Sequence, residues 1–319
     1  MFRKHTRRAA KAAFAVSFGV ALLIGLTACG GAKHSGVAGA QKTLSASGKP
    51  TIVLGTKNFT EEYILGQLYG QALAAKGFHV VYKGSFGSSE LANTAIDSGK
   101  MNFYPEYTGI IVLDLAQSKK FPQTAAATWK AAKKYEQKHG QTLLTRTPFV
   151  DSDTFTVLAK TANKFGVKTI SDMKKVKHFS YAALPECKTR VTCLLGLKNV
   201  YGLKQVKFVP LSSISVYTLL DKGQVTGGDG FTTDPQQNSK KYKALVDNKH
   251  IFGFQNVAPV ISQKLLSGTA GSQIAQVSNK VSSLLTIKAM RAMDKAAYVQ
   301  KATPKDIAHG FLAANGLLK

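Results

Sequence analysis

The chain has 319 residues, of which 44% are hydrophobic and 19% charged, so it is long and apolar enough for a packed core and is not disordered by composition. Its 43 lysines and arginines outnumber its 17 aspartates and glutamates, which gives a formal net charge of +26. No RNP, zinc-finger or helix-turn-helix pattern is present, and the lysines are spread over the whole length, which argues against nucleic-acid binding. We interpret most lysines as solvated surface, with attraction to an anionic envelope or membrane surface as the alternative.

The first 28 residues are typical of a secretory signal peptide. After a basic head, residues 12–27 form an apolar run of about 16 residues, which is short for a membrane span. The run ends at Leu26-Thr27-Ala28-Cys29, which resembles the lipobox of bacterial lipoproteins. Its small residues suit a signal peptidase, and Cys29 would then carry the lipid that tethers the mature protein. An ordinary cleaved signal with a chance cysteine is the alternative.

Residues 29–50 are expected to hold the lipidated cysteine and a flexible tether, because this stretch is rich in Gly, Ala, Ser, Lys and Gln and has no periodic pattern. The folded part is expected to begin near Thr51. Export and lipidation would place the protein on the outer face of the bacterial cytoplasmic membrane.

The folded part begins with a predicted β-α-β unit. Residues 51–55 form a short apolar run of strand type, and a helix opens at Thr60 or Glu61. Gly77 ends this helix, and residues 78–82 predict the second strand. The apolar residues of the helix recur at helical spacing: Ile64, Leu65, Leu68, Leu73 and Ala74.

The alternation of helices and strands continues along the chain. Residues 90–98 predict a helix, and residues 101–104 predict a third strand that ends at Pro105. This order implies an α/β fold with mixed, mostly parallel sheets covered by helices on both faces. Further helices are predicted at 125–139, 170–173, 215–222, 272–285 and 287–299.

The length beyond the leader exceeds one doubly wound domain, so we expect two lobes. The extended apolar stretches 154–159 and 252–261 are expected to be crossing, hinge-forming connections between them. The first lobe would then comprise 51–151 plus 254–319, and the second lobe 152–253.

Two cysteines of the exported part, Cys187 and Cys193, stand six positions apart in a polar stretch and predict a disulfide that closes a small loop. Zinc is disfavoured because no second Cys or His pair stands at ligand spacing, and the seven histidines are scattered. We therefore expect no metal and no cofactor.

The sequence shows no Gly-x-Ser-x-Gly elbow, no Walker loop and no His-Glu-x-x-His motif. Glu61, Glu62 and Glu106 suggest an acid/base pair for hydrolysis, but we favour a capping or hinge role because Glu61 stands near a helix start. The prediction is a protein without catalytic residues that is not an enzyme.

Two motifs at strand ends are the most informative: Lys57-Asn58-Phe59-Thr60-Glu61-Glu62 and Tyr104-Pro105-Glu106-Tyr107-Thr108-Gly109. They place a cation, carboxylates and an aromatic ring where α/β folds bind small molecules. Together with further markers they resemble a family: the glycine betaine, choline and proline betaine binding proteins of osmoprotectant ABC importers, with the type II periplasmic-binding-protein fold. The further markers are residues 169–173, 196–203, 232–234 and 257–260.

This resemblance implies a cage of aromatic rings for a quaternary ammonium group, which cannot donate a strong hydrogen bond and is attracted to ring faces. Carried over residue by residue, the cage positions fall on Tyr107, Phe155 and Phe231. Gln255 stands where the family usually has a fourth tyrosine, and its neighbour Phe254 could fill that place if the alignment slips by one residue.

For the ligand's carboxylate, the family's lysine matches Lys57 and its arginine matches Arg190, one from each lobe. Asp153, two residues before Phe155, is also included among the expected ligand contacts. Ile110 stands where many betaine binders have a threonine.

The resemblance implies a lipid-anchored, monomeric solute receptor that captures a betaine-like osmolyte, such as glycine betaine, choline or proline betaine. It would pass the solute to an ABC permease and, through it, to an ATPase. Ile110 and Gln255 depart from the family pattern, so the alternative is an envelope interaction or sensor protein with an altered ligand site.

Overall fold

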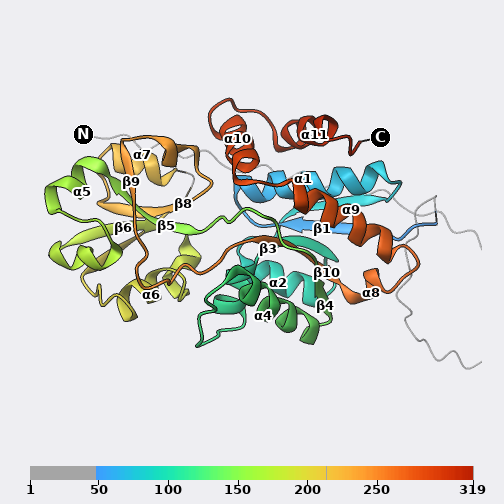
Figure 1. Cartoon of the computed structure of the whole chain (residues 1–319), viewed down its shortest axis with the longest axis horizontal. Helices are drawn as coiled ribbons and strands as arrows, with labels where there is room; N and C mark the ends of the chain where they lie inside the picture. The colour runs from blue at the N-terminus through green and yellow to red at the C-terminus, as the bar shows by residue number, and fades with distance from the viewer. Residues whose placement is uncertain (1–47, 213, 319) are drawn as a thin grey trace, which may run out of the picture. The chain divides into compact units, whose positions relative to one another are not determined.

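The computed structural model describes residues 48–212 and 214–318. The predicted signal peptide, Cys29 and the predicted tether up to residue 47 lie outside these residues. The described part contains two five-stranded sheets, each with its own helices (Figure 1). None of its helices is long and apolar enough to cross a membrane.

The first sheet has the strand order β2-β1-β3-β10-β4. Its strands are β1 (Ile52–Thr56), β2 (Val80–Ser85), β3 (Phe103–Tyr107), β4 (Gln141–Leu143) and β10 (Val257–Ser262). The helical segments of this lobe are α1 (Thr60–Ala75), α2 (Ser89–Asp97), α3 (Thr108–Ile110), the π-helical turn η1 (Ile111–Leu115), α4 (Ala125–Lys138), α8 (Gln263–Leu266), α9 (Gly271–Leu284), α10 (Ile287–Tyr298) and α11 (Pro304–Ala314).

The second sheet has the strand order β7-β6-β8-β5-β9. Its strands are β5 (Asp153–Leu158), β6 (Phe179–Ala183), β7 (Val206–Pro210), β8 (Gly227–Phe231) and β9 (Tyr242–Leu245). Its helices are α5 (Ala159–Phe165), α6 (Leu194–Asn199) and α7 (Val216–Asp221), and its 3₁₀ turns are η2 (Ile170–Lys175), η3 (Pro185–Thr189) and η4 (Pro235–Asn238).

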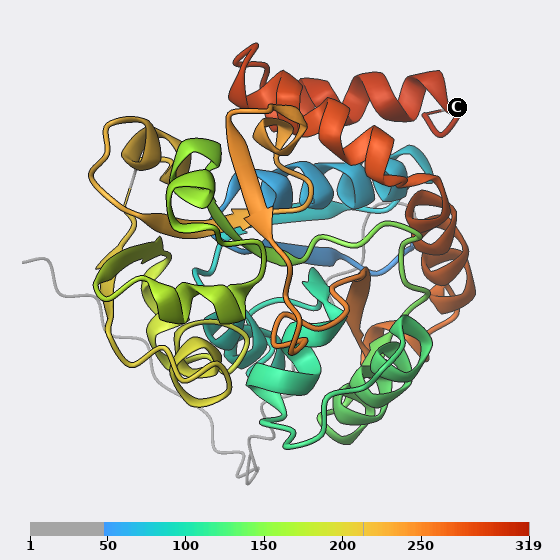
Figure 2. The ribbon, with the colours of Figure 1, turned by 60° about the vertical axis from the view of Figure 1, so that its left-hand side comes forward.

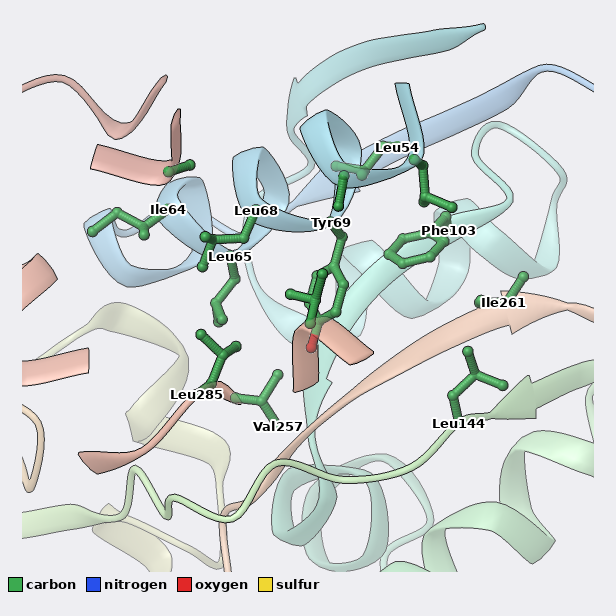
Figure 3. Packing of buried hydrophobic residues seen from close by; sticks show 14 of the residues in the cluster. Leu54, Ile64, Leu65, Leu68, Tyr69, Phe103, Leu144, Val257, Ile261 and Leu285 are labelled. Carbon is green, nitrogen blue, oxygen red and sulfur yellow. The ribbon is translucent and has the colours of Figure 1, made fainter. Parts of the chain in front are cut away.

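Helix α1 organises the core of the first lobe. Its apolar stripe, with Ile64, Leu65 and Leu68 fully buried, packs on β1 and on the C-terminal helices, and Figure 3 shows these side chains along α1 in the same cluster as Leu54 and Phe103. Figure 2 shows the C-terminal helices, in red, lying along α1, in blue. Because each buried leucine or isoleucine contributes about 1.5 to 3 kcal/mol, this stripe holds the start of α1 in place.

The prediction that the third strand ends at Pro105 is wrong. Strand β3 runs through Pro105 and continues to Tyr107. Pro105 lies opposite Pro259 of the antiparallel strand β10, at a pair where neither residue has an N–H to donate. Such a pair fits only the non-hydrogen-bonded positions of an antiparallel ladder, so the strand loses no bond there. The continuation brings Tyr107 to the end of the strand.

Both sheets are mixed, and in each sheet the antiparallel pairing involves the strand that follows a crossing between the lobes. The predicted parallel pairing holds for β1 with β2 and β3, and for β6 with β7 and β8. Strands β10 and β5, which each enter a sheet after the chain has crossed from the other lobe, pair antiparallel with both of their neighbours. The expected two-lobed α/β fold is confirmed.

The crossing segments correct a second prediction. Most of the stretch 154–159 belongs to β5, and residues 257–261 belong to β10, so these parts of the two runs are sheet strands, whereas residues 252–256 lie in a crossing segment as predicted. The chain crosses between the sheets just before each of them, in segments 144–152 and 246–256. The apolar residues pair within a sheet because an extended apolar run buries its side chains best there.

Candidate ligand-binding site

A pocket lies between the two lobes, at the ends of β1, β3 and β8 and at the start of β5. All of the expected ligand-binding residues except Phe155 line it. The full lining is Lys57, Asn58, Phe59, Ser88, Ser89, Tyr107 and Ile110 from the first lobe, Asp151 and Gln255 from the crossing segments, and Asp153, Leu184, Glu186, Cys187, Arg190, Thr192, Cys193, Asp229 and Phe231 from the second lobe.

Three aromatic rings face one another in this pocket. The ring centroids of Phe59 and Tyr107 lie 6.1 Å apart with 24° between their planes, and those of Phe59 and Phe231 lie 6.2 Å apart with 5° between their planes. Phe59 therefore links an aromatic ring of its own lobe to one of the other lobe. Phe59 was not predicted as a site residue, although it stands inside the motif that follows β1, directly before α1.

Phe155 lies in the core of the second lobe instead. It is fully buried, and its ring centroid lies 4.7 Å from that of Tyr181 and 5.9 Å from that of Phe179. A side chain at Gly227, which is next to β5 in the sheet, would begin 2.5 Å from the Phe155 ring. The missing side chain thus provides room for this ring in the core and away from the pocket.

Lys57 meets carboxylates of the protein itself. Its ammonium pairs with Glu106 and lies 3.4 Å from Glu62 Oε1, and all three side chains are buried. The same nitrogen lies 4.0 Å from the centroid of the Tyr107 ring. Lys57, which was predicted to meet the ligand's carboxylate, is therefore paired with carboxylates of its own lobe.

The two glutamates at the start of α1 have different contacts. Glu62 Oε2 accepts the backbone N–H of Lys57 at 3.1 Å, which satisfies a donor beside the helix start. Burial raises the pKa of Glu62 to about 7, against the lowering effect of Lys57. Glu61 accepts the Tyr107 hydroxyl at 2.7 Å. This bond fixes the Tyr107 ring.

Acidic side chains line the opposite wall. Tyr181 donates its hydroxyl to Asp229 at 2.9 Å, and Thr233 donates its hydroxyl to Asp151 at 2.7 Å. Burial raises the pKa of Asp153 to about 7, against the lowering charge of Arg190. Burial, and then the charge of Asp153, raise the pKa of Asp229 well above its usual range. A cation bound nearby would favour the ionised form of both carboxyls.

A small loop of the second lobe closes the pocket against the first lobe. Cys187 and Cys193 form a disulfide, with their Cα atoms 5.2 Å apart. Between them, Arg190 Nε donates to Glu90 Oε1 at 2.9 Å and Nη2 donates to Oε2 at 3.0 Å. Although burial raises it, the hydrogen bonds and charge of Arg190 bring the pKa of Glu90 down to about 2.

A second contact joins the same loop to the first lobe. The hydroxyl of Thr192 donates to Asp114 Oδ2 at 2.5 Å, and the backbone N–H of Val191 donates to Asp114 Oδ1 at 3.1 Å. The disulfide loop thus holds two carboxylates of the other lobe.

Gln255 is held by the backbone on both sides of its amide. Its Oε1 accepts the N–H of Ile110 at 3.0 Å, and its Nε2 donates to the carbonyl of Phe252 at 3.0 Å. The side chain is buried, and a side chain at Gly109 would begin 2.6 Å from its amide oxygen. Gln255 and Ile110 therefore form one packed unit where a crossing segment meets the first lobe.

Among residues 48–212 and 214–318, no set of three or more His, Cys, Asp or Glu side chains is arranged to hold a metal ion. The groups in the pocket are suited to binding a solute. Ring faces attract a cation, carboxyls accept a hydrogen bond from a donor, and the two basic side chains are already paired with carboxylates.

Comparison with known proteins shows the family of this chain. A family model described as "Substrate binding domain of ABC-type glycine betaine transport system" matches residues 50–314. The glycine-betaine-binding protein of Pseudomonas aeruginosa is 28% identical over 305 residues, which cover 91% of this chain and 93% of that protein. The carnitine transport binding protein OpuCC of Listeria monocytogenes is 24% identical, over 85% of this chain and 89% of that protein.

Solved structures share the fold. A crystal structure titled as a glycine betaine/carnitine/choline ABC transporter superimposes with a TM-score of 0.66 at 20% identity, over 84% of this chain and 100% of that chain. These relatives are binding proteins of transport systems and not enzymes.

Proposed function

Because this chain belongs to the family of substrate-binding domains of ABC-type glycine betaine transport systems, we propose that it is the solute receptor of such an importer. It captures a betaine-like solute with an ammonium head in the pocket between its lobes. It then delivers the solute to a membrane permease, which an ATPase drives, and performs no chemistry on the solute.

The observation that carries this proposal is the aromatic group of Phe59, Tyr107 and Phe231. The three rings line one pocket and come from both lobes. A methylated ammonium gains about 2 kcal/mol or more from a desolvated ring face. A cation in contact with Phe59 of one lobe and Phe231 of the other would therefore hold the two lobes together, as a receptor that closes on its solute requires.

The test is ligand binding by the purified protein. Glycine betaine, choline, proline betaine and carnitine are each titrated by calorimetry and screened by thermal shift, since a ligand that binds the folded state raises its melting temperature. At least one should bind. The double variant Phe59→Ala and Phe231→Ala should weaken that binding about tenfold or more.

The matched control is Phe165→Ala, because Phe165 is a partly exposed ring on α5 outside the pocket. It should leave the affinity unchanged. If no solute of the panel binds to the folded protein, the receptor proposal loses its support.

The signal peptide and a lipid anchor at Cys29 form the second part of the proposal. They are supported by the apolar run at 12–27 and by the small residues before Cys29. Metabolic labelling with an alkyne fatty acid should mark the protein, and Cys29→Ser should abolish the label and release the protein from membranes. A label that survives Cys29→Ser would exclude this anchor.

A further inference from the structure

The charge of the pocket is opposite to that of the chain. Basic residues outnumber acidic ones by 43 to 17 in the sequence, yet four carboxyl side chains and only two basic side chains line the pocket. The carboxyls are those of Asp151, Asp153, Glu186 and Asp229. A concentration of acids in one pocket of a basic protein favours a cation there.

Both basic side chains of the pocket are already engaged by first-lobe carboxylates. Lys57 pairs with Glu106 and Glu62, and Arg190 gives two hydrogen bonds to Glu90. A carboxylate on the ligand would either share a cation with a carboxylate already bound to it, which places like charges side by side, or displace that partner and leave its charge without compensation. Both are costly. The pocket is therefore poorly prepared for a zwitterion.

Asp153 and Asp229 form an acidic pair on one face of the second sheet. In the antiparallel ladder of β5 and β8, Asp153 lies opposite Phe231 and Phe155 lies opposite Asp229, so these side chains share a face. Within residues 48–212 and 214–318, no lysine or arginine forms an ion pair with Asp151, Asp153 or Asp229.

The acidic pair adjoins the aromatic group. Directly opposed residues of a ladder have Cβ atoms about 5 Å apart, so Asp153 stands next to the Phe231 ring. An ammonium on that ring and a donor group on Asp153 would be separated by a few ångströms, the length of a two-carbon chain.

We infer that the pocket selects a solute of net positive charge, an ammonium without a carboxylate, whose O–H or N–H group donates to the Asp153 and Asp229 pair. This inference rests on the proposed receptor function and narrows its solute. The Phe231 ring takes the ammonium, because the ammonium of Lys57 already lies over Tyr107 and Phe59. The acidic pair takes the donor and rejects a carboxylate.

Three probes of similar size separate the two requirements. Choline has a net charge and a hydroxyl donor, trimethyl(propyl)ammonium has the charge without the donor, and glycine betaine has a carboxylate in place of the hydroxymethyl group. By calorimetry, choline should bind about tenfold or more tightly than either of the others, since a hydrogen bond to a charged group is worth that much.

The variants Asp153→Asn and Asp229→Asn should bring the affinity ratios of choline to each of the other probes toward one. A ratio between ligands is not moved by a general loss of stability. The control is Asp221→Asn, which removes an acid that pairs with Lys241 outside the pocket. If Asp229→Asn does not fold, the affinity ratios of Asp153→Asn alone decide the question, because Asp153 is only half-buried.

If glycine betaine binds as tightly as choline, or if both variants leave the ratios unchanged, the inference is overturned and the receptor function stands. If none of the three probes binds, the inference is overturned too, and the wider panel described above then decides separately whether the receptor function survives.

Discussion

The guanidinium of Arg190 in the second lobe holds the carboxylate of Glu90 in the first lobe through two parallel hydrogen bonds. This pair stabilises the arrangement in which both lobes wall the pocket. Arg190→Lys cannot form the two-pronged contact. Because Glu90 is 43% exposed, we expect a cost of about 1 kcal/mol, seen as a roughly fivefold loss of ligand affinity by calorimetry.

The control for this prediction is Asp172→Asn, which breaks an ion pair with Lys175 inside the second lobe. That variant should keep the wild-type affinity. An affinity that rises in Arg190→Lys would mean that the pair opposes ligand binding.

The disulfide of Cys187 and Cys193 should matter for both stability and binding. Replacing both cysteines by serine frees the loop in the unfolded chain, and a loop of this size predicts a loss of about 2 kcal/mol in unfolding free energy. Affinity should fall as well, because Arg190 and Thr192 hold the first lobe from within this loop. Urea unfolding and calorimetry measure the two effects.

A reductant provides the internal comparison for the disulfide. It should lower the stability of the wild-type protein toward that of the double serine variant and leave the variant itself unchanged. Equal stability of the oxidised wild type and the variant would contradict the prediction.

The elements that sequence periodicity predicted best are the helices that pack on one face. For α4, α9 and α10, the predicted ends lie within one residue of the observed ends. The apolar residues of a helix that packs on one face recur at helical spacing, and the limits of that pattern mark the ends of the helix. The end of β3 was placed too early, since a proline stops a strand only where an N–H is needed. At Pro105 the partner is another proline.

The site was predictable in position but only partly in its contacts. The resemblance to betaine-binding proteins predicted Tyr107, Phe231 and Arg190 as ligand contacts, and all three line one pocket. Whether an aromatic side chain faces a pocket or a core depends on its neighbours across the sheet, and the room beside Gly227 decides this for Phe155. The pairing of Lys57 with Glu106 joins residues far apart in the chain, which spacing along the sequence does not reveal.

Gln255→Met tests whether Gln255 acts through the fold or on the ligand. The change removes the acceptor for the Ile110 N–H and the donor to the Phe252 carbonyl, both in a buried site. Leaving such groups unpaired should lower the unfolding free energy by about 1 to 3 kcal/mol, measured in urea. Ligand affinity, measured by calorimetry, should change by less than about twofold. Loss of a hydrogen bond to a charged group of the ligand would instead lower it roughly tenfold.

Gln71→Met is the control for this prediction, because Gln71 is only partly buried and donates near the surface to Gln67 and to the Lys305 carbonyl. Its stability should stay near that of the wild type. A large affinity loss in Gln255→Met at unchanged stability would identify Gln255 as a ligand contact.

Glu136, which lies away from the pocket, should make the unfolding free energy of the protein depend on pH. It is fully buried on α4, and neither of its carboxyl oxygens has a hydrogen-bond partner among the described residues. Burial, and then the charges of Glu106 and Asp97, raise its pKa to about 8. In the unfolded chain the pKa is about 4.3, so the folded state binds the proton more tightly and stability falls as pH rises from about 4 to 8.

Glu136→Met should therefore stabilise the protein, because it fills a similar volume without a charge. The gain should be small near about pH 5 and reach about 2 kcal/mol or more near about pH 9, where the wild-type carboxyl must ionise in the core. Urea unfolding at both pH values measures it. Glu136→Gln should flatten the pH dependence to the same extent with a smaller gain, since its amide keeps polar atoms in the same buried place. Wild-type and Glu136→Met stabilities that stay parallel across this pH range would show that Glu136 does not titrate as its burial requires.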